Sequence, residues 1–334
     1  MSRAVVLARH PEGVVCEADF AVEDRPEAPL PAGHFRTRNR VLSLDAGFRQ
    51  WMTAGAGDNY LQGMQIGDPV QSIVLGEVIE SDHEGYPLGT LISARTAWEE
   101  SSVLDGSDLC SPLTVSADVP LYQYMGILGP TGMTAWIGLY EVGQPKASDT
   151  VVVSAAGGAV GTVVGQLARA DGCRVIGLTS TQSKAQWLVE EVGYDMVIDR
   201  ETQPDLAAAL AQAAPRGIDV FFDNVGGEAL DTVMGHLSEG ARLVLCGAIS
   251  QYEGAVTPLR HSWELITKRA RMEGFMFSDY VDEFPDVMAT LESALRDGTI
   301  KTFDQQYNGI EQTPQAFCDM MHGASRGKCL VVVG

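Results

Sequence analysis

The sequence predicts an α/β protein in which a doubly wound parallel sheet is inserted into a discontinuous, β-rich domain. After about residue 125, near-continuous apolar runs alternate with segments of helical spacing, whereas earlier runs are short and split by Pro, Gly and Asp. Strands that are buried on both faces have such continuous runs, and the alternation with helices indicates a parallel sheet. We expect residues 126–299 to form this sheet, and residues 1–125 and 300–334 to form the β-rich domain.

The N-terminal part has strand-like runs separated by turn residues. Between Pro, Gly and Asp clusters lie AVVLA at 4–8, VLSL at 41–44 and PVQSIVLGEVIES at 69–81. Short apolar runs bounded by such residues are typical of strands joined by irregular loops. The same mixed pattern of short runs returns after about residue 300. There a helix candidate, PQAFCDMMHGA, precedes the apolar run KCLVVVG. We expect this last strand to rejoin the first domain.

The central part supplies the strands and helices of the parallel sheet. Helical spacing joins Val160, Val163, Val164 and Leu167, and recurs near residues 207–211 and 230–237. The strand candidates between these helices are residues 150–155, 174–179, 196–199, 218–223, 242–247 and 271–277.

Composition excludes several classes of partner. The 334 residues include 23 Lys and Arg against 44 Asp and Glu, for a formal net charge of −21. Nucleic acids and anionic lipid surfaces are bound by clustered cations, so neither is an expected partner. We find no run of about 18 apolar residues that would span a membrane. The six cysteines form no CxxC pair and follow no signal peptide, which predicts reduced thiols in the cytoplasm.

The segment TVVVSAAGGAVGTVVGQLA has the order strand, small-residue turn, helix that a dinucleotide site requires. Its fingerprint positions are Ala156, Gly158 and Gly161, with Ala in place of the first Gly. The small residues allow a tight turn, close approach of a pyrophosphate and close packing of helix on strand. The pyrophosphate would lie at the helix N-terminus, near its free amides.

The end of the second strand indicates which dinucleotide is bound. An NAD site places Asp or Glu there to bind the ribose hydroxyls, but this chain has Gly177 to Thr181 without an acid. Lys184 and Arg200 follow the second and third strands, and cations of this kind bind a 2′-phosphate. These residues favour NADPH, although each cation taken alone is equally consistent with a solvated surface charge.

Many segments together resemble the zinc-independent medium-chain dehydrogenases/reductases, in the branch of prostaglandin and leukotriene reductases, alkenal double-bond reductases and bacterial curcumin reductases. The resemblance covers nearly the whole chain. It includes LSLDAGFRQWM, GMTAWIGLYEVGQPK, VVSAAGGAVGTVVGQLA, FFDNVGGE, LCGAISQY, RMEGFMF and RGKCLVVV. It implies a Rossmann domain inserted in a GroES-like domain, and a cytoplasmic, often dimeric, NADPH-dependent enzyme that reduces the double bond of enones and enals.

The resemblance also assigns residues. It places the phosphate loop at Gly158, Ala159, Val160 and Gly161, and the 2′-phosphate contacts at Lys184 and Arg200. The remaining cofactor contacts that it implies are Asn224, Cys246, Gly247, Ala248, Ile249, Ser250, Tyr252, Phe275, Met276 and Phe277.

Three departures from the family pattern fall on segments that the resemblance places near the substrate. They are the loss of Pro together with Gly47 in place of an aromatic residue, Ser325 where the family often has Asn, and a short stretch after Ser81.

The sequence predicts chemistry without a metal. The six cysteines and six histidines show no spacing of zinc ligands. In the expected reaction a hydride is added to the β-carbon, and a donor stabilises the charge that develops on the carbonyl oxygen. Tyr252 is the candidate donor, because a phenol is neutral at pH 7 and can donate a hydrogen bond.

Several alternatives remain at this stage. The α-carbon proton comes from Tyr252 or from water, and Tyr252 is nearly as well explained as a residue that orients its loop. The chain is also compatible with a quinone reductase of the same fold, or with an NADPH-binding protein without turnover.

Overall fold

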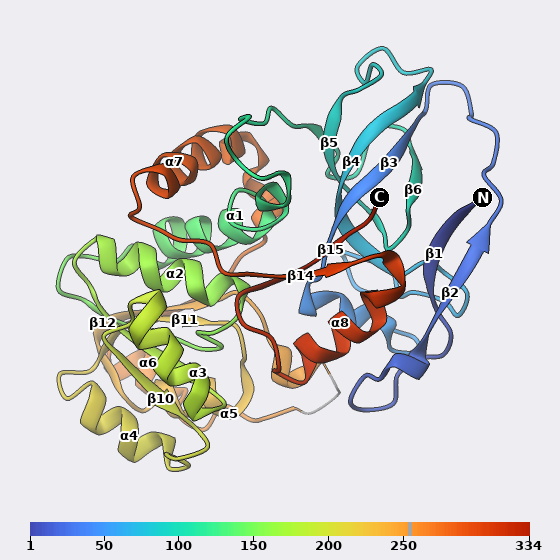
Figure 1. Cartoon of the computed structure of the whole chain (residues 1–334). Coiled ribbons are helices and arrows are strands. Elements are labelled where there is room, and N and C mark those ends of the chain that lie inside the picture. The colour runs from blue at the N-terminus through green and yellow to red at the C-terminus, as the bar shows by residue number, and fades with distance from the viewer. Residues whose placement is uncertain (253–255) are drawn as a thin grey trace. The chain divides into compact units, whose positions relative to one another are not determined.

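The computed structural model describes residues 1–252 and 256–334, in two compact units. Unit 1 comprises Met1–Gly126 and Asp304–Gly334, and unit 2 comprises Ile127–Phe303 (Figure 1). Unit 1 is therefore discontinuous in sequence, and unit 2 is inserted between its two parts.

Unit 2 contains a six-stranded sheet in the order β10-β9-β8-β11-β12-β13, and every pair is parallel. The order reverses between β8 and β11, as in a doubly wound dinucleotide-binding fold. This arrangement confirms the predicted fold class. The strands are β8 (Thr150–Val153), β9 (Arg174–Thr179), β10 (Met196–Asp199), β11 (Ile218–Asp223), β12 (Leu237–Leu245) and β13 (Arg271–Gly274).

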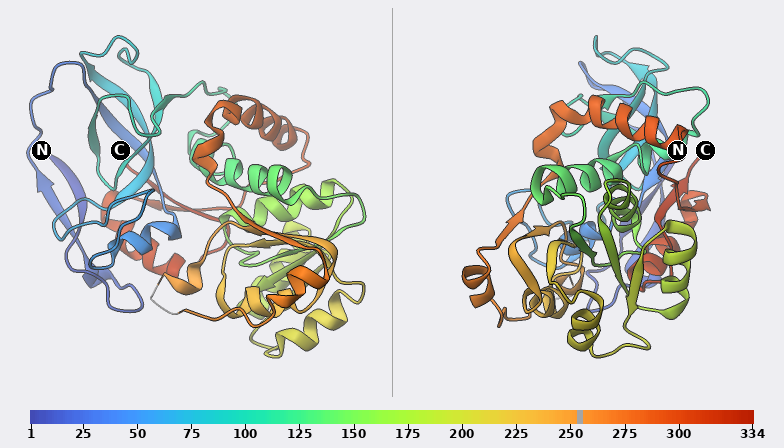
Figure 2. Two further views of the ribbon diagram at one scale, coloured as in Figure 1. Left: turned by 180° about the vertical axis from the view of Figure 1, so that it is seen from behind. Right: turned by 90° about the vertical axis from the view of Figure 1, so that its left-hand side faces the viewer.

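Helices cover both faces of this sheet (Figures 1 and 2). On one face α2 packs against α1, which also contacts α7; on the other face α4 packs against α5 over a core of buried apolar residues. Strands covered on both faces need apolar side chains on both faces, and all four residues of β8 are buried. The helices are α1 (Pro130–Ile137), α2 (Ala159–Ala170), α3 (Gln182–Trp187), α4 (Leu206–Ala213), α5 (Gly227–Met234), α6 (Trp263–Thr267) and α7 (Phe284–Arg296).

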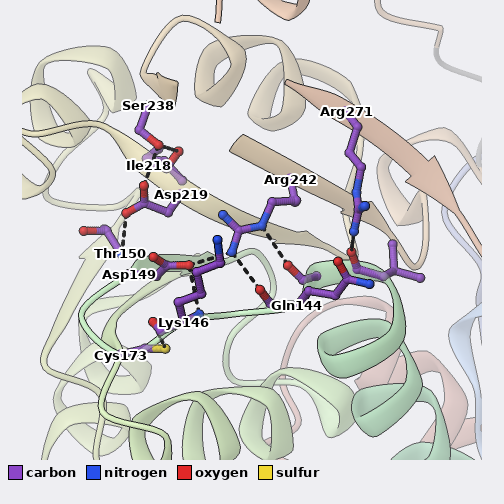
Figure 3. Close-up of polar contacts among 12 residues, drawn as sticks. Gln144, Lys146, Asp149, Thr150, Cys173, Ile218, Asp219, Ser238, Arg242 and Arg271 are labelled. Carbon is purple, nitrogen blue, oxygen red and sulfur yellow. Dashed lines mark hydrogen bonds and ion pairs between the residues drawn. The ribbon is translucent and has the colours of Figure 1, made fainter. Parts of the chain in front are cut away.

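Polar contacts close the amino-terminal end of the sheet (Figure 3). Arg242 of β12 forms an ion pair with Asp149 at 2.6 Å and donates to the carbonyl oxygens of Gly143 and Gln144, both at 2.9 Å. Asp219 accepts a hydrogen bond from the backbone of Thr150 at 2.8 Å. These contacts hold the loop before β8 against the sheet, so the opposite, carboxyl-terminal end is the one available for a ligand.

Unit 1 is β-rich. Its largest sheet has the order β14-β15-β3-β4-β5-β7, with β6 paired to β3, and β1 and β2 form a separate pair. Strand β15 pairs with β3 in antiparallel orientation, so the C-terminal strand lies in the same sheet as β3. The elements are β1 (Ser2–Leu7), β2 (Phe20–Arg25), β3 (Phe35–Ser43), β4 (Gln71–Ser81), β5 (Leu91–Ala97), β6 (Ser101–Leu104), β7 (Ser111–Pro112), β14 (Asp304–Asn308), α8 (Thr313–Met321) and β15 (Lys328–Val332).

The observed strands of unit 2 differ from the expected ones at three places, and the first is the strand expected at 150–155, which ends at Val153. The strand expected at 242–247 begins earlier, at Leu237, and ends at Leu245. The strand expected at 271–277 ends at Gly274, and a short 3-10 helix, Phe277–Glu283, follows. No helix in the described residues combines the length and the apolar content that a membrane span needs.

Candidate cofactor site

The predicted cofactor residues of unit 2 follow the carboxyl ends of its parallel strands. The glycine turn follows β8, Lys184 and Arg200 come after β9 and β10, and Asn224 follows β11. Because all these strands are parallel, their carboxyl ends meet at one edge of the sheet. Ligands of open α/β sheets bind at this edge, where the strand order reverses, and here that point lies between β8 and β11.

The turn between β8 and α2 leaves no room for a side chain at Gly161. Ala155 adopts a left-handed conformation with φ of 46°, and the Gly158 amide donates to the Ala155 carbonyl at 2.9 Å. A Cβ on Gly161 would lie 2.6 Å from that carbonyl oxygen, so a larger residue would displace the turn. No side chain among the described residues caps α2 at Gly158, so its first amides remain available to an anion. This geometry fits a pyrophosphate.

Tyr194 supports this turn from behind. Its side chain is buried, and its hydroxyl donates to the Gly161 carbonyl at 2.7 Å. A Cβ on Gly165 would lie 2.3 Å from the Tyr194 ring, and one on Gly177 would lie 3.1 Å from it. No sequence pattern predicted a role for Tyr194. The sequence nevertheless contains a signal for it. Gly161 and Gly165 lie on one face of α2, and Gly177 lies on β9. Glycines in these positions leave space for a bulky neighbour.

The two predicted 2′-phosphate contacts, Lys184 and Arg200, have different surroundings. The side chain of Lys184 lies beside the glycine turn, with its Cδ 3.6 Å from the position of a Cβ on Gly157. The guanidinium of Arg200 instead faces the carboxylate of Glu228 at 3.4 Å. Glu201, which the sequence analysis did not consider, accepts a hydrogen bond from the Gln182 amide at 3.2 Å. Lys184 therefore lies beside the turn, and Arg200 has a competing acidic partner.

Asp223 connects β8 with β11 at the point where the strand order reverses. Its carboxylate is fully buried and accepts hydrogen bonds from the Ser154 hydroxyl at 2.7 Å and from the Val225 and Gly226 amides at 3.0 Å. Burial raises the pKa of Asp223, and these hydrogen bonds oppose the rise. The carboxylate thus stabilises the turn before Gly226, as expected for a structural residue.

Asn224 is held by the same network. Its amide nitrogen Nδ2 donates to the Ser154 carbonyl at 2.8 Å, and its backbone N–H donates to the Ser154 hydroxyl at 2.8 Å. Ser154 thus orients both Asp223 and Asn224, a role that the sequence analysis did not assign. The residues are 69 and 70 positions apart in sequence, so only the fold brings them together.

The segment after β12 packs onto this network through its backbone. The Cys246 and Gly247 amides donate to the Asp223 carbonyl at 2.9 and 3.1 Å. Ile249 donates to the Asn224 carbonyl at 3.4 Å, and the Ser250 hydroxyl donates to the Val225 carbonyl at 2.6 Å. Burial raises the pKa of the Cys246 thiol to about 12, so this cysteine is not a nucleophile at neutral pH.

Tyr252 points back into its own loop. Its hydroxyl accepts a hydrogen bond from the Ala248 amide at 3.2 Å and lies 3.4 Å from the position of a Cβ on Gly247. Burial is the main cause that raises the pKa of Tyr252 above its usual value, so the phenol is neutral at physiological pH. The structure thus brings Asn224, Gly247, Ala248 and Tyr252 together. The neutral phenol can therefore donate a hydrogen bond to a further acceptor.

Residues 275–277 follow β13 and so lie at the same edge of the sheet, but the side chains of Phe275 and Phe277 pack against other residues of unit 2. Strand β13 pairs Gly274 with Leu245, so the two chains leave the sheet side by side. The Phe275 ring lies 2.6 Å from the position of a Cβ on Gly138, and Phe277 stacks on Phe284 at 5.8 Å. Met276 is 38% exposed.

Comparisons with known proteins agree with this geometry. Residues 3–111 match the family model described as the N-terminal domain of oxidoreductase, and residues 159–293 match the model described as zinc-binding dehydrogenase. The chain is 34% identical to a tobacco (Nicotiana tabacum) NADP(+)-dependent 2-alkenal reductase, covering 99% of this chain and 97% of that protein. Rabbit (Oryctolagus cuniculus) prostaglandin reductase 1 is 34% identical, with 96% and 90% covered.

The chain belongs to the prostaglandin and alkenal reductase branch of the zinc-independent medium-chain dehydrogenases/reductases. A solved structure of this branch, CurA from Vibrio vulnificus in complex with NADPH, matches with a TM-score of 0.91 and 34% identity over 99% of each chain. The protein is an NADP-dependent oxidoreductase, and its cofactor is NADPH. Within the part of the chain that the structure describes, no group of three His, Cys, Asp or Glu side chains could hold a metal ion.

Proposed function

We propose that this protein reduces the carbon–carbon double bond of α,β-unsaturated ketones and aldehydes. The observation that carries the proposal is the neutral, half-buried Tyr252 phenol in the loop that packs on Asn224 at the cofactor edge of the sheet. The chain also belongs to a branch that includes a 2-alkenal reductase, and this membership supports the same chemistry. When bound, NADPH supplies a hydride to the β-carbon of the substrate.

Tyr252 would donate a hydrogen bond to the carbonyl oxygen as that atom gains negative charge. Its hydroxyl accepts from the Ala248 amide at 3.2 Å, which fixes the oxygen, and no described residue accepts a hydrogen bond from its O–H. A preorganised donor in a buried site stabilises developing charge without reorganisation of solvent. The proton that the α-carbon needs comes from this phenol or from water, which balances the hydride gained at the β-carbon.

The cofactor residues divide into two groups in this proposal. The first amides of α2, from Gly158 to Gly161, would hold the pyrophosphate, and Lys184 with Arg200 would hold the 2′-phosphate. The loop of Cys246 to Tyr252, together with Asn224 and residues 275–277, would contact the nicotinamide and its ribose. Unit 2 would bind NADPH, and unit 1 would supply the substrate side.

We also propose a cytoplasmic homodimer. Strand β13 lies at one edge of the six-stranded sheet, and an antiparallel pair centred on Met272 would set Arg271 opposite Glu273 of the second copy. The exposed side chains Trp263 and Ile266 lie on α6, directly before this strand. The six cysteines are free thiols, as in proteins of a reducing compartment. Sedimentation of the wild type and of a Glu273→Arg variant tests the dimer.

The function is tested by following NADPH oxidation with enals, enones and quinones. The proposal predicts turnover of enals and enones and a saturated carbonyl product. Turnover of quinones alone would identify a quinone reductase, and NADPH binding without oxidation of any substrate would identify a binding protein. Either result would refute the proposal.

Substitution of Tyr252 tests its role. In Tyr252→Phe we expect kcat to fall about tenfold or more while NADPH affinity is kept, since a positioned donor contributes roughly that much or more. Tyr140→Phe is the matched control, because Tyr140 is also a half-buried tyrosine of unit 2 whose hydroxyl bonds to Asp171, away from the loop of Tyr252. Unchanged turnover and unchanged substrate affinity in Tyr252→Phe would remove this residue from the mechanism.

A further inference from the structure

Helix α5 carries a buried aspartate that the proposed mechanism does not use. The side chain of Asp231 is only 5% exposed. Its Oδ1 accepts hydrogen bonds from the backbone amides of Arg260 and His261, the second at 3.0 Å. Its Oδ2 faces the Nδ1 atom of the His261 ring at 3.2 Å. One carboxylate of α5 therefore holds two consecutive residues of the segment 256–262, which leads into α6.

These contacts keep Asp231 ionised although it is buried. Burial alone would raise the pKa of Asp231, but the His261 and Arg260 amides and the charge of His261 bring the pKa below its usual value. Hydrogen bonds from backbone amides to a charged acceptor are stronger than neutral ones. The ionised carboxylate is therefore a firm anchor for the segment 256–262.

Two glycines allow the same segment to lie along α5. Gly227, Asp231 and Gly235 are spaced four residues apart, as are residues on one face of a helix. A Cβ on Gly235 would lie 3.4 Å from the His261 ring, and a Cβ on Gly227 would lie 3.5 Å from Oγ1 of Thr257. The part from Thr257 to His261 therefore follows α5, with Asp231 at its centre.

The loop of Cys246 to Tyr252 approaches the start of the same helix. The Cβ position on Gly227 that lies near Thr257 is also 2.6 Å from Oγ of Ser250, and this hydroxyl donates to the Val225 carbonyl. Ser250 and Thr257 thus share the space above Gly227, so the position of one limits the position of the other. Through this contact point, the segment that Asp231 anchors bears on the loop that carries Tyr252.

We propose that Asp231 is a positioning residue: it holds the segment 256–262 on α5 and thereby keeps the Tyr252 hydroxyl where it can donate to the substrate carbonyl. This inference rests on the proposed function. Asp231 would touch neither substrate nor cofactor and would act only through the loop of Tyr252. A donor misplaced by about 1 Å can slow a reaction by up to about a hundredfold, so a residue that only holds the loop can change kcat.

The test measures kcat at saturating enone and NADPH. Asp231→Ala should lower kcat about tenfold, as Tyr252→Phe does, while the Kd for NADPH changes by less than about threefold, because the phosphate sites at α2 are untouched. Asp231→Asn keeps an oxygen for the two amides and should retain kcat within about twofold of the wild type. Unchanged kcat in Asp231→Ala, or an equal fall in Asp231→Asn, would overturn the proposal.

A double variant shows whether Asp231 acts through Tyr252. Asp231→Ala added to Tyr252→Phe should lower kcat by no more than about twofold further, because the donor is already absent. A second full loss would overturn the proposal.

The matched control is Asp219→Ala. Asp219 is also an aspartate of unit 2 that accepts from a backbone amide, that of Thr150 at 2.8 Å, but it lies at the opposite end of the sheet. Its loss should lower the free energy of unfolding and leave kcat unchanged. A fall in kcat as large as that of Asp231→Ala would attribute both effects to lost stability and would refute the positioning role.

Arg260→Pro removes one of the two donors instead of the acceptor, at a residue whose side chain is 69% exposed. If Asp231→Ala does not fold, Arg260→Pro should lower kcat about threefold or more, and unchanged kcat would refute the role.

If the wild type reduces no enone or enal, the proposed function fails, and hydrogen exchange then decides the inference. Asp231→Ala should speed exchange of the Gly247 to Tyr252 amides about tenfold, whereas Asp219→Ala should not. Equal exchange of these amides in the wild type and in Asp231→Ala would show that Asp231 does not hold the loop.

Discussion

Replacing Gly165 with alanine tests how α2 is packed behind the phosphate turn. The new Cβ would lie 2.3 Å from Cζ, 2.4 Å from Cε2 and 2.5 Å from the hydroxyl of Tyr194. Tyr194 is buried and cannot move without losing its 2.7 Å hydrogen bond to the Gly161 carbonyl. The first turn of α2 would therefore shift with the ring.

The expected loss of stability follows from three contributions. Overpacking of a buried site costs about 1–3 kcal/mol, and loss of the hydrogen bond adds about 1 kcal/mol. The higher helix propensity of alanine offsets about 1 kcal/mol of this loss. Gly165→Ala should lower the free energy of unfolding by roughly 2 kcal/mol and should also weaken NADPH binding.

The same substitution in a Tyr194→Ala variant tests whether the overlap with the Tyr194 ring causes the loss of stability. In Tyr194→Ala the overlapping atoms are absent, so adding Gly165→Ala should stabilise that variant by about 0.5–1 kcal/mol. Urea unfolding of the four proteins gives the free energies, and fluorescence titration gives the NADPH affinities. Equal destabilisation by Gly165→Ala in both backgrounds would show that Tyr194 does not set the packing of α2.

Three further outcomes are expected. Lys184→Ala with Arg200→Ala should weaken NADPH about tenfold or more relative to NADH in fluorescence titrations, and an equal loss for both cofactors would contradict the assignment of the 2′-phosphate site. Asp149→Ala removes the ion pair drawn in Figure 3 and should lower the free energy of unfolding by about 2–4 kcal/mol while NADPH affinity is kept, because the pair lies at the opposite end of the sheet. At pH 8 the folded protein should react with iodoacetamide at the exposed Cys16 and not at Cys246, because desolvation raises the pKa of the Cys246 thiol to about 12. Mass spectrometry locates the label, and rapid labelling of Cys246 would contradict the raised pKa.

Local patterns predicted the central α/β region well. The segment from Arg174 to Thr179 is a strand as expected, and α2 begins at Ala159 as the glycine turn indicated. Both depend on neighbours in the chain: apolar runs, turn residues and helical spacing. The strand expected at 271–277 is shorter, because its register with β12 ends at Gly274.

The supporting contacts of the site could not be predicted in this way. Ser154 acquires its role from Asp223 and Asn224, about seventy positions away. Tyr194 reaches Gly161 across 33 positions, and Glu201 reaches the backbone of Gln182 from the turn after β10. A single sequence shows residue types and spacings, whereas these contacts depend on which strands lie side by side.

The central claim is that the hydride is added to the β-carbon of an enone. We would incubate the protein with an enone and NADPH deuterated on one or the other face of the nicotinamide ring, and locate the deuterium in the product by NMR. The account predicts a saturated ketone with deuterium on the β-carbon, from one face of the cofactor only. Deuterium on the carbonyl carbon of an allylic alcohol, or no transfer to any enone or enal, would contradict it.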